Sequence, residues 1–197
     1  MNDIGKSIML VGVGGQGIIR ASDILSSVIM DAGYDVKKSE VHGMAQRGGC
    51  VSSHVRYADK VFSPLAMKGG VDLLISFEKL ETLRYLDYLI SNGKIIINNE
   101  EIYPPSVNMG EGEYPSDVVE TIRKYFHDIT VVEASVLAEK AGDMRMTNTV
   151  MLGALSVHMS IDQALWEEVL KRTFSGRMAK MNLSAFSMGR NIQGTEI

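Results

Sequence analysis

The chain has 197 residues, of which 45% are hydrophobic and 22% are charged, and its formal net charge is −4. This composition is typical of a globular protein, so it excludes a disordered tail, and the acidic balance argues against a general nucleic-acid binder. The length predicts a single domain over residues 1–197. Cys50 is the one cysteine, so the chain cannot form an internal disulfide or complete a four-cysteine metal site.

Short apolar runs alternate with helical patterns over the first 135 residues. Continuous apolar runs are typical of buried parallel strands, whereas apolar positions three and four residues apart indicate helices. The pattern predicts an α/β three-layer sandwich with a Rossmann-like, mainly parallel sheet and a helical C-terminal third. We predict strands over residues 8–11, 36–41, 51–57, 71–77, 94–98 and 129–133, and helices over 18–30, 78–90, 116–126, 135–141, 148–158, 162–173 and 177–189.

Two segments between these elements have distinctive patterns. Residues 51–57 alternate apolar and polar side chains, which indicates a half-exposed strand, and a turn at 58–59 followed by 60–63 predicts a hairpin that makes the sheet mixed. His54 and Arg56 share one face of that strand, where they either extend a site or face solvent. Residues 99–116 contain three of the four prolines, so we expect an irregular crossing loop.

The first glycine-rich loop follows the first predicted strand and precedes the first predicted helix. Gly12, Gly14 and Gly17 satisfy the pattern G-x-G-x-x-G, which lets backbone approach a phosphate at a helix N-terminus. The alternative is a structural turn that only requires small residues. A dinucleotide site also needs an acid at the end of the second strand, and Glu40 could fill that role.

A second glycine-rich segment, residues 39–50, follows the second predicted strand. It contains His42, which can act as an acid or base near neutral pH, and Arg47, which can bind a carboxylate or phosphate. Gln46 adds a side-chain amide. The alternative is a solvated turn, but loops that follow successive parallel strands meet at the carboxyl edge of a sheet, where ligands bind. We therefore expect the two glycine-rich loops to share one edge.

No apolar run reaches the roughly 18 residues that a membrane helix requires. The N-terminus lacks the basic and apolar regions of a signal peptide. We therefore expect a cytoplasmic protein that binds neither membrane nor nucleic acid.

Five segments together resemble the gamma-type subunit of 2-oxoacid:ferredoxin oxidoreductases. They are VGVGGQG at 11–17, EVHGMAQRGG at 40–49, SHVR at 53–56, FEKLE at 77–81 and NTVMLGA at 148–154. The resemblance covers roughly residues 5–185. The second segment is long and specific, whereas the glycine loop alone would not be. Within the family, the chain looks most like the beta subunit of indolepyruvate ferredoxin oxidoreductase.

The resemblance implies a subunit of an enzyme that decarboxylates a 2-oxoacid oxidatively, forms an acyl-coenzyme A and reduces ferredoxin. Thiamine diphosphate and iron–sulfur clusters would belong to larger partner subunits, and the isolated chain would be inactive. This chain would complete the active-site cleft and hold coenzyme A, which is a substrate. Candidate residues for the coenzyme A phosphates or the cleft are Gly12, Gly14, Gly15, Gln16, Gly17, Glu40, Gln46 and Arg47, with His42 and Arg47 as possible catalytic groups.

Three alternatives stay open at this point. The chain resembles the gamma subunit of pyruvate or 2-oxoisovalerate ferredoxin oxidoreductases nearly as well. From a different class, the glycine loop and Glu40 fit a free-standing NAD(P)-dependent oxidoreductase. A non-catalytic binding module with a vestigial glycine loop is the third alternative.

Overall fold

The computed structural model describes residues 5–43 and 49–192. Six strands in these residues form one sheet in the spatial order β2-β3-β1-β4-β5-β6. Only β3 runs antiparallel to its neighbours, so the sheet is mixed but mainly parallel, as predicted. The strands are β1 (Lys6–Val13), β2 (Asp35–His42), β3 (Cys50–Ala58), β4 (Val71–Ser76), β5 (Leu89–Asn98) and β6 (Ile129–Val132).

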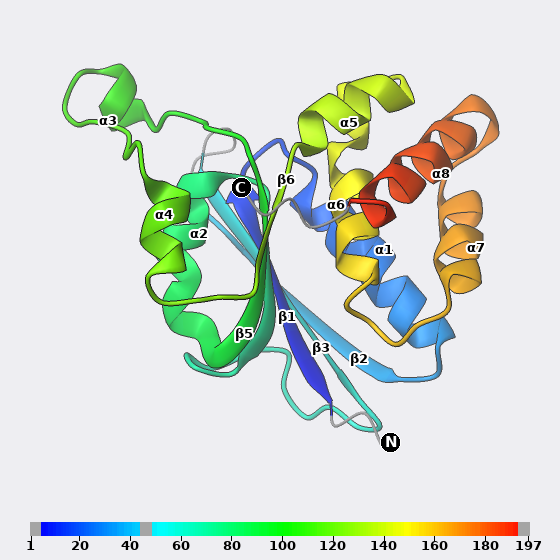
Figure 1. Ribbon diagram of the computed structural model, residues 1–197. Helices are drawn as coiled ribbons and strands as arrows, with labels where there is room; N and C mark the ends of the chain where they lie inside the picture. Colours follow the sequence, from blue (N-terminus) through cyan, green and yellow to red (C-terminus); the bar gives the residue numbers. More distant parts are fainter. Residues whose placement is uncertain (1–4, 44–48, 193–197) are drawn as a thin grey trace.

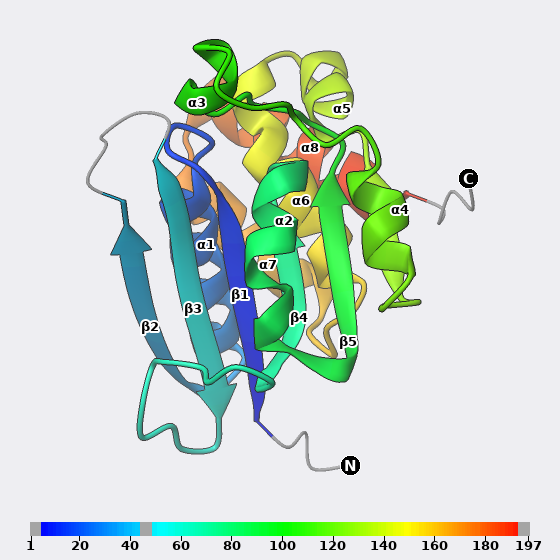
Figure 2. The same cartoon turned by 90° about the vertical axis from the view of Figure 1, so that its left-hand side faces the viewer.

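Helices cover both faces of the sheet, which confirms the predicted three-layer α/β arrangement (Figures 1 and 2). One face carries α1 (Ile18–Asp31) and the helical C-terminal third, which comprises α5 (Ala134–Ala141), α6 (Thr147–Ser156), α7 (Gln163–Thr173) and α8 (Gly176–Arg190). The other face carries α2 (Lys79–Tyr85) and α4 (Val118–Arg123). No helix within the described residues has the length and apolarity needed to cross a membrane.

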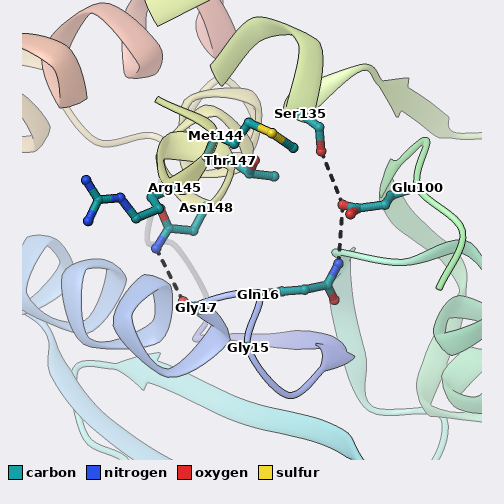
Figure 3. Close-up of a pocket in the computed structure, with 9 residues that line it drawn as sticks. All are labelled: Gly15, Gln16, Gly17, Glu100, Ser135, Met144, Arg145, Thr147 and Asn148. Carbon is teal, nitrogen blue, oxygen red and sulfur yellow. Dashed lines mark hydrogen bonds between the residues drawn. The ribbon is translucent and has the colours of Figure 1, made fainter. Parts of the chain in front are cut away.

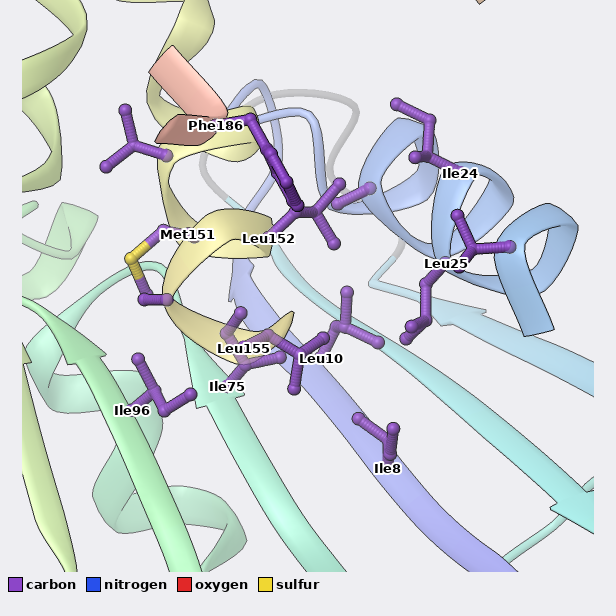
Figure 4. Close-up of a cluster of buried hydrophobic side chains, with 14 of the residues drawn as sticks. Ile8, Leu10, Ile24, Leu25, Ile75, Ile96, Met151, Leu152, Leu155 and Phe186 are labelled. Atoms are coloured by element: carbon purple, nitrogen blue, oxygen red, sulfur yellow. The ribbon is translucent and has the colours of Figure 1, made fainter. Parts of the chain in front are cut away.

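The alternation of side chains along β1 supplies both cores. Ile8 and Leu10 point into the layer with α1 and α6, whereas Met9 and Val11 point into the layer with α2 and α4. All four are at most 2% exposed. Burying a side chain of this size contributes about 1.5–3 kcal/mol. Figure 4 shows the larger core, in which Leu152 and Leu155 of α6 lie over the strands.

Two glycines allow α6 and α8 to cross at very short range. A Cβ on Gly153 would lie 2.2 Å from the Phe186 carbonyl oxygen, and a Cβ on Gly189 would lie 2.0 Å from the Val150 carbonyl oxygen. Backbone contact at this distance excludes any side chain, so glycine is required for steric reasons. This crossing holds α6 between α8 and the sheet, and every residue from Asn148 to Ser156 is buried.

The predicted hairpin at 51–63 is wrong, although its consequence for the sheet is right. Residues 60–63 form no strand, and β3 instead pairs antiparallel with both β2 and β1. The expected half-exposure of β3 is also wrong, because α1 covers one face and the segment after β3 folds over the other. His54 accepts a 3.3 Å hydrogen bond from the Ala66 N–H, and Arg56 donates to the Ser63 carbonyl at 3.0 Å. These two residues therefore hold that segment in place.

Several boundaries also differ from the prediction. The helix expected to reach residue 90 ends at Tyr85, and a 3-10 turn (Leu86–Tyr88) leads directly into β5. The pairing register between β4 and β5 shifts between Val71 and Leu73. The first half of β5 is therefore irregular, and its side chains do not follow the period-two alternation that indicates a strand. The helix expected at 116–126 is the shorter α4, and the crossing loop at 99–116 includes a single turn, α3 (Pro105–Asn108).

Candidate functional site

A pocket of about 380 Å³ opens at the carboxyl edge of the sheet. Its walls come from the loop between β1 and α1, the residue two places after β5, the start of α5, and the 3-10 turn η2 (Met144–Met146) with the start of α6 (Figure 3). Crevices beyond the carboxyl ends of strands are where open α/β sheets bind ligands. The lining residues are Gly15, Gln16, Gly17, Glu100, Ser135, Met144, Arg145, Thr147 and Asn148.

The positions of the first loop require glycine for different physical reasons. Gly15 (φ +111°) and Gly17 (φ +78°) adopt conformations that side-chain-bearing residues rarely adopt. A Cβ on Gly15 would have no atom within 4 Å, so its backbone is open to the pocket. Gly12 is instead packed, because its Cβ would lie 2.9 Å from the Phe77 Cβ. Gly15 and Gly17 thus belong to the pocket, whereas Gly12 belongs to the packing beneath it.

Gln16 ties the loop to the end of β4. Its Oε1 accepts a 2.8 Å hydrogen bond from the Val13 N–H, and its Nε2 donates to the Phe77 carbonyl at 2.8 Å. The side chain therefore fixes the shape of the loop from inside while it lines the pocket.

The loop side of the pocket suits an anion. Helix α1 begins after Gly17, which has no side chain to cap the first-turn N–H groups. Uncapped N–H groups and the positive end of the helix dipole favour a phosphate or carboxylate at such a terminus. The Arg145 guanidinium also lines the pocket, but it donates three hydrogen bonds to the Asp143 carboxylate, which offsets its charge. Hydrogen bonds from Arg145 lower the pKa of Asp143 to about 2.

The two glycine-rich loops meet at this edge, as predicted. The Gly14 N–H donates a 2.8 Å hydrogen bond to the Gly49 carbonyl. His42 is the last residue of β2, and its backbone pairs with Val51 of β3. The side chain of His42, together with Gln46 and Arg47, lies outside the described residues, so their proposed roles remain predictions.

Glu40 does not line this pocket. Instead, Glu40 Oε1 accepts a 2.6 Å hydrogen bond from Lys38 Nζ, and Lys38 also pairs with Asp23 of α1. Burial lowers the pKa of Lys38, but the hydrogen bonds with Asp23 and Glu40 outweigh it, and the net shift is upward. The dinucleotide pattern assumes that the second strand neighbours the first, whereas here β3 lies between them. Each strand adds about 4.8 Å, so Glu40 is displaced from the glycine loop.

Sequence reasoning missed the pocket residues that lie outside the glycine loop. Among them are Glu100, Ser135, Arg145 and Asn148. The signal available for Glu100 was its position just after a predicted strand, the same argument that singled out the two glycine loops. Asn148 lies in a segment that carried the family resemblance, but nothing local indicated that it faces Gly17. Within residues 5–43 and 49–192, no three His, Cys, Asp or Glu side chains are arranged to hold a metal ion.

Comparison with known proteins gives one family for nearly the whole chain. The family model described as pyruvate ferredoxin/flavodoxin oxidoreductase matches residues 7–192. The chain is 41% identical to the indolepyruvate oxidoreductase subunit IorB of Archaeoglobus fulgidus, over 94% of each chain. It is 35% identical to the IorB subunit of Pyrococcus horikoshii, over 93% of each chain. The common gamma subunit of pyruvate/ketoisovalerate oxidoreductases of Thermococcus litoralis is 28% identical, over 88% of this chain and 89% of that one.

Two solved structures share the fold. Subunit PORC of the pyruvate oxidoreductase of Thermotoga maritima superimposes with a TM-score of 0.72 at 22% identity, over 95% of this chain and 96% of that one. A structure of the 2-oxoglutarate:ferredoxin oxidoreductase of Magnetococcus marinus, with 2-oxoglutarate, coenzyme A and succinyl-CoA bound, gives a TM-score of 0.74 at 22% identity. That match covers 95% of this chain but 31% of the longer one.

Proposed function

Because the chain belongs to the pyruvate ferredoxin/flavodoxin oxidoreductase family, we propose that it is one subunit of an indolepyruvate-type 2-oxoacid:ferredoxin oxidoreductase. The observation that carries this proposal is 41% identity to an IorB subunit over 94% of both chains. The complex converts an arylpyruvate and coenzyme A into the arylacetyl-coenzyme A, carbon dioxide and a proton, and the two electrons released reduce ferredoxin. The pyruvate or 2-oxoisovalerate gamma subunit is the second candidate, supported by the 28% identity to a common gamma subunit.

The cofactors of this reaction belong to a larger partner subunit. A four-iron cluster takes four cysteine thiolates, and the chain has one cysteine. When bound, thiamine diphosphate supplies the carbanion chemistry and the clusters carry the electrons. This chain, as one domain over residues 1–197, closes the cleft of the complex and binds the acyl acceptor.

The described pocket is the proposed place for the phosphate part of coenzyme A. Gly15 and Gly17 bring backbone to its surface, and the N-terminus of α1 stabilises negative charge there. Gln16 keeps the loop in shape, and Gly14 joins it to Gly49. The remaining candidates for this cleft are His42, Gln46 and Arg47 of the second loop. Glu40, which bonds with Lys38, stabilises β2 in this proposal.

The first experiment tests whether the chain is a subunit of such a complex. The tagged chain is purified anaerobically from its own cells, and its partners, iron and thiamine diphosphate are measured. We expect a larger subunit that contains both cofactors, and a complex that reduces a viologen dye with indolepyruvate and coenzyme A but much more slowly with pyruvate or 2-oxoisovalerate. Faster turnover of pyruvate would favour the second candidate. A lone chain that binds NAD(H) would favour the free-standing oxidoreductase, and a lone chain that does not would favour the binding module.

The second experiment tests the pocket in the assembled complex. Gly15→Val and Gly33→Val impose the same kind of backbone strain, since both glycines have positive φ and a Cβ at either position would have no atom within 4 Å. Of these two glycines, Gly15 lines the pocket and Gly33 does not. The KM for coenzyme A of the Gly15→Val complex should therefore be about ten times that of the Gly33→Val complex. Equal KM values would exclude the pocket. Arg47→Ala tests the second loop by the same measurement, and an unchanged KM would exclude Arg47.

A further inference from the structure

Glu100 holds a carboxylate at the wall of the pocket that faces the glycine loop. It follows β5 by two residues, and hydrogen bonds from three separate elements end on its Oε2. The donors are Asn98 Nδ2 at 2.8 Å, Ser135 Oγ at 3.2 Å and Gln16 Nε2 at 3.4 Å. Figure 3 shows Glu100 between Gln16 and Ser135. The carboxylate is therefore held in one orientation.

The residue that supports Glu100 is itself held rigidly. Asn98 is 1% exposed, its Nδ2 also donates to the Phe77 carbonyl at 3.1 Å, and its Oδ1 accepts from the Ala134 N–H at 3.0 Å. The same Phe77 carbonyl accepts from Gln16. Asn98 thus connects the carboxylate to the glycine loop and to the start of α5. Supporting contacts of this kind preorganise a binding group.

The second oxygen of Glu100, Oε1, accepts none of the hydrogen bonds identified among the described residues. The cations in and beside the pocket have other partners, since Lys79 pairs with Glu101 at 2.6 Å and Arg145 pairs with Asp143 at 2.6 Å. Arg145 lies on the opposite side of the pocket from Glu100 (Figure 3). An ionised carboxylate can only accept hydrogen bonds. The pocket therefore has one end that suits an anion and another that suits a neutral donor.

We propose that Glu100 is a specificity-determining residue, which accepts a hydrogen bond from a hydroxyl or amide N–H of the same ligand whose phosphate lies at Gly15 and Gly17. This inference rests on the proposed function, because it assumes that the phosphate-bearing ligand is coenzyme A. Two parts of that molecule carry such donors, the pantetheine arm and the adenosine. A fixed negative charge at this end repels a second phosphate, so it also sets the direction in which the ligand lies.

The test uses three competitive inhibitors against coenzyme A in the assembled complex. They are 4′-phosphopantetheine, 3′,5′-ADP and inorganic pyrophosphate, of which only pyrophosphate lacks a neutral donor. Glu100→Gln keeps the size of the side chain but replaces one oxygen by an amide donor. It should raise the inhibition constant of at least one organic probe about tenfold, the usual effect of losing a hydrogen bond to a charged group. The constant for pyrophosphate should stay the same or fall, because a negative charge is removed.

Glu101→Gln is the matched control. Glu101 is the next residue, is exposed and pairs with Lys79, but it does not line the pocket, so all three constants should match those of the unaltered complex. Whichever organic probe is weakened by Glu100→Gln identifies the part of the ligand that reaches the carboxylate. If assembly of the Glu100→Gln complex fails, Glu100→Asp, which withdraws the carboxylate by one methylene, replaces it with the same expectation.

Either of two results would overturn the proposal: inhibition constants that do not change, or constants that rise equally for all three probes. Failure of the underlying function has a different signature. In that case Gly15→Val would leave the KM for coenzyme A equal to that of Gly33→Val, and none of the three probes would compete with coenzyme A.

Discussion

The side-chain amide of Asn148 donates a 3.4 Å hydrogen bond to the backbone carbonyl of Gly17, although the two residues lie 131 positions apart. This contact joins the first turn of α6 to the residue that precedes α1. The helical C-terminal third therefore completes a pocket whose other wall is an N-terminal glycine loop.

Replacement of Gly17 by alanine tests this contact. A Cβ at Gly17 would lie 2.8 Å from Asn148 Nδ2, whereas a Cβ at Gly33, which also has positive φ, would have no atom within 4 Å. Gly33→Ala should lower the free energy of unfolding by about 1–2 kcal/mol, the cost of the left-handed conformation. Gly17→Ala should cost about 1 kcal/mol more, because Asn148 must also move. Urea denaturation of the full chain measures both, and equal losses would contradict the steric argument.

The crossing of α6 and α8 should be among the least tolerant places in the chain. Gly153→Ala would place a Cβ 2.2 Å from the Phe186 carbonyl oxygen, so the helices must separate. We expect a loss of about 3 kcal/mol or more, at the upper end of overpacking effects. Gly112→Ala is the control, since its Cβ would meet nothing within 4 Å, and its thermal midpoint should stay the same or rise slightly. A Gly153→Ala protein with the wild-type midpoint would refute the close crossing.

A buried carboxylate at the start of α2 should depend on Tyr114 for a hydrogen bond that stabilises the folded chain. Glu78 is 1% exposed, and its Oε1 accepts a 2.6 Å hydrogen bond from the Tyr114 hydroxyl. Burial, together with this hydrogen bond to Glu78, raises the pKa of Tyr114 well above 10. Tyr114→Phe removes a donor to a charged group, so the free energy of unfolding should fall by about 1.5–3 kcal/mol.

Tyr103→Phe provides the matched comparison for Tyr114→Phe. Tyr103 packs beside Tyr114 with ring centroids 5.2 Å apart, but it is 51% exposed. Loss of its hydroxyl should change the free energy of unfolding by less than about 0.5 kcal/mol. Equal effects of the two substitutions, measured by chemical denaturation, would show that Glu78 does not need this hydrogen bond.

His54 should make the protein less stable in mild acid. Burial lowers its pKa from 6.5, and its Nδ1 accepts a hydrogen bond from the Ala66 N–H, which a protonated ring could not do. Because the unfolded chain then binds more protons than the folded chain, stability falls as the pH drops through about 6.5. His54→Gln should reduce the change in unfolding free energy between pH 7.5 and pH 5.5. An unchanged pH dependence, measured by urea denaturation at both pH values, would exclude His54 as a source.

Local sequence patterns predicted most of the elements for a clear reason. Apolar runs such as those of β1 and β4 are buried on both faces, so their composition indicates strands without knowledge of their neighbours. Helices α5 to α8 began and ended close to their predicted positions because their apolar spacing is helical. The failures were at 51–63 and 78–98, where the partner of a strand and an irregular register decided the outcome.

The sequence by itself determined the α/β class, the two glycine-rich loops and the family, because each depends on residues that are close together in the chain. Only the tertiary structure decided what faces those loops. The insertion of β3 between β1 and β2 moved Glu40 away from the glycine loop, and the order of the strands placed Glu100 opposite it instead. Strand order and helix crossings arise from contacts between distant segments, such as Gly17 with Asn148, and no local periodicity encodes them.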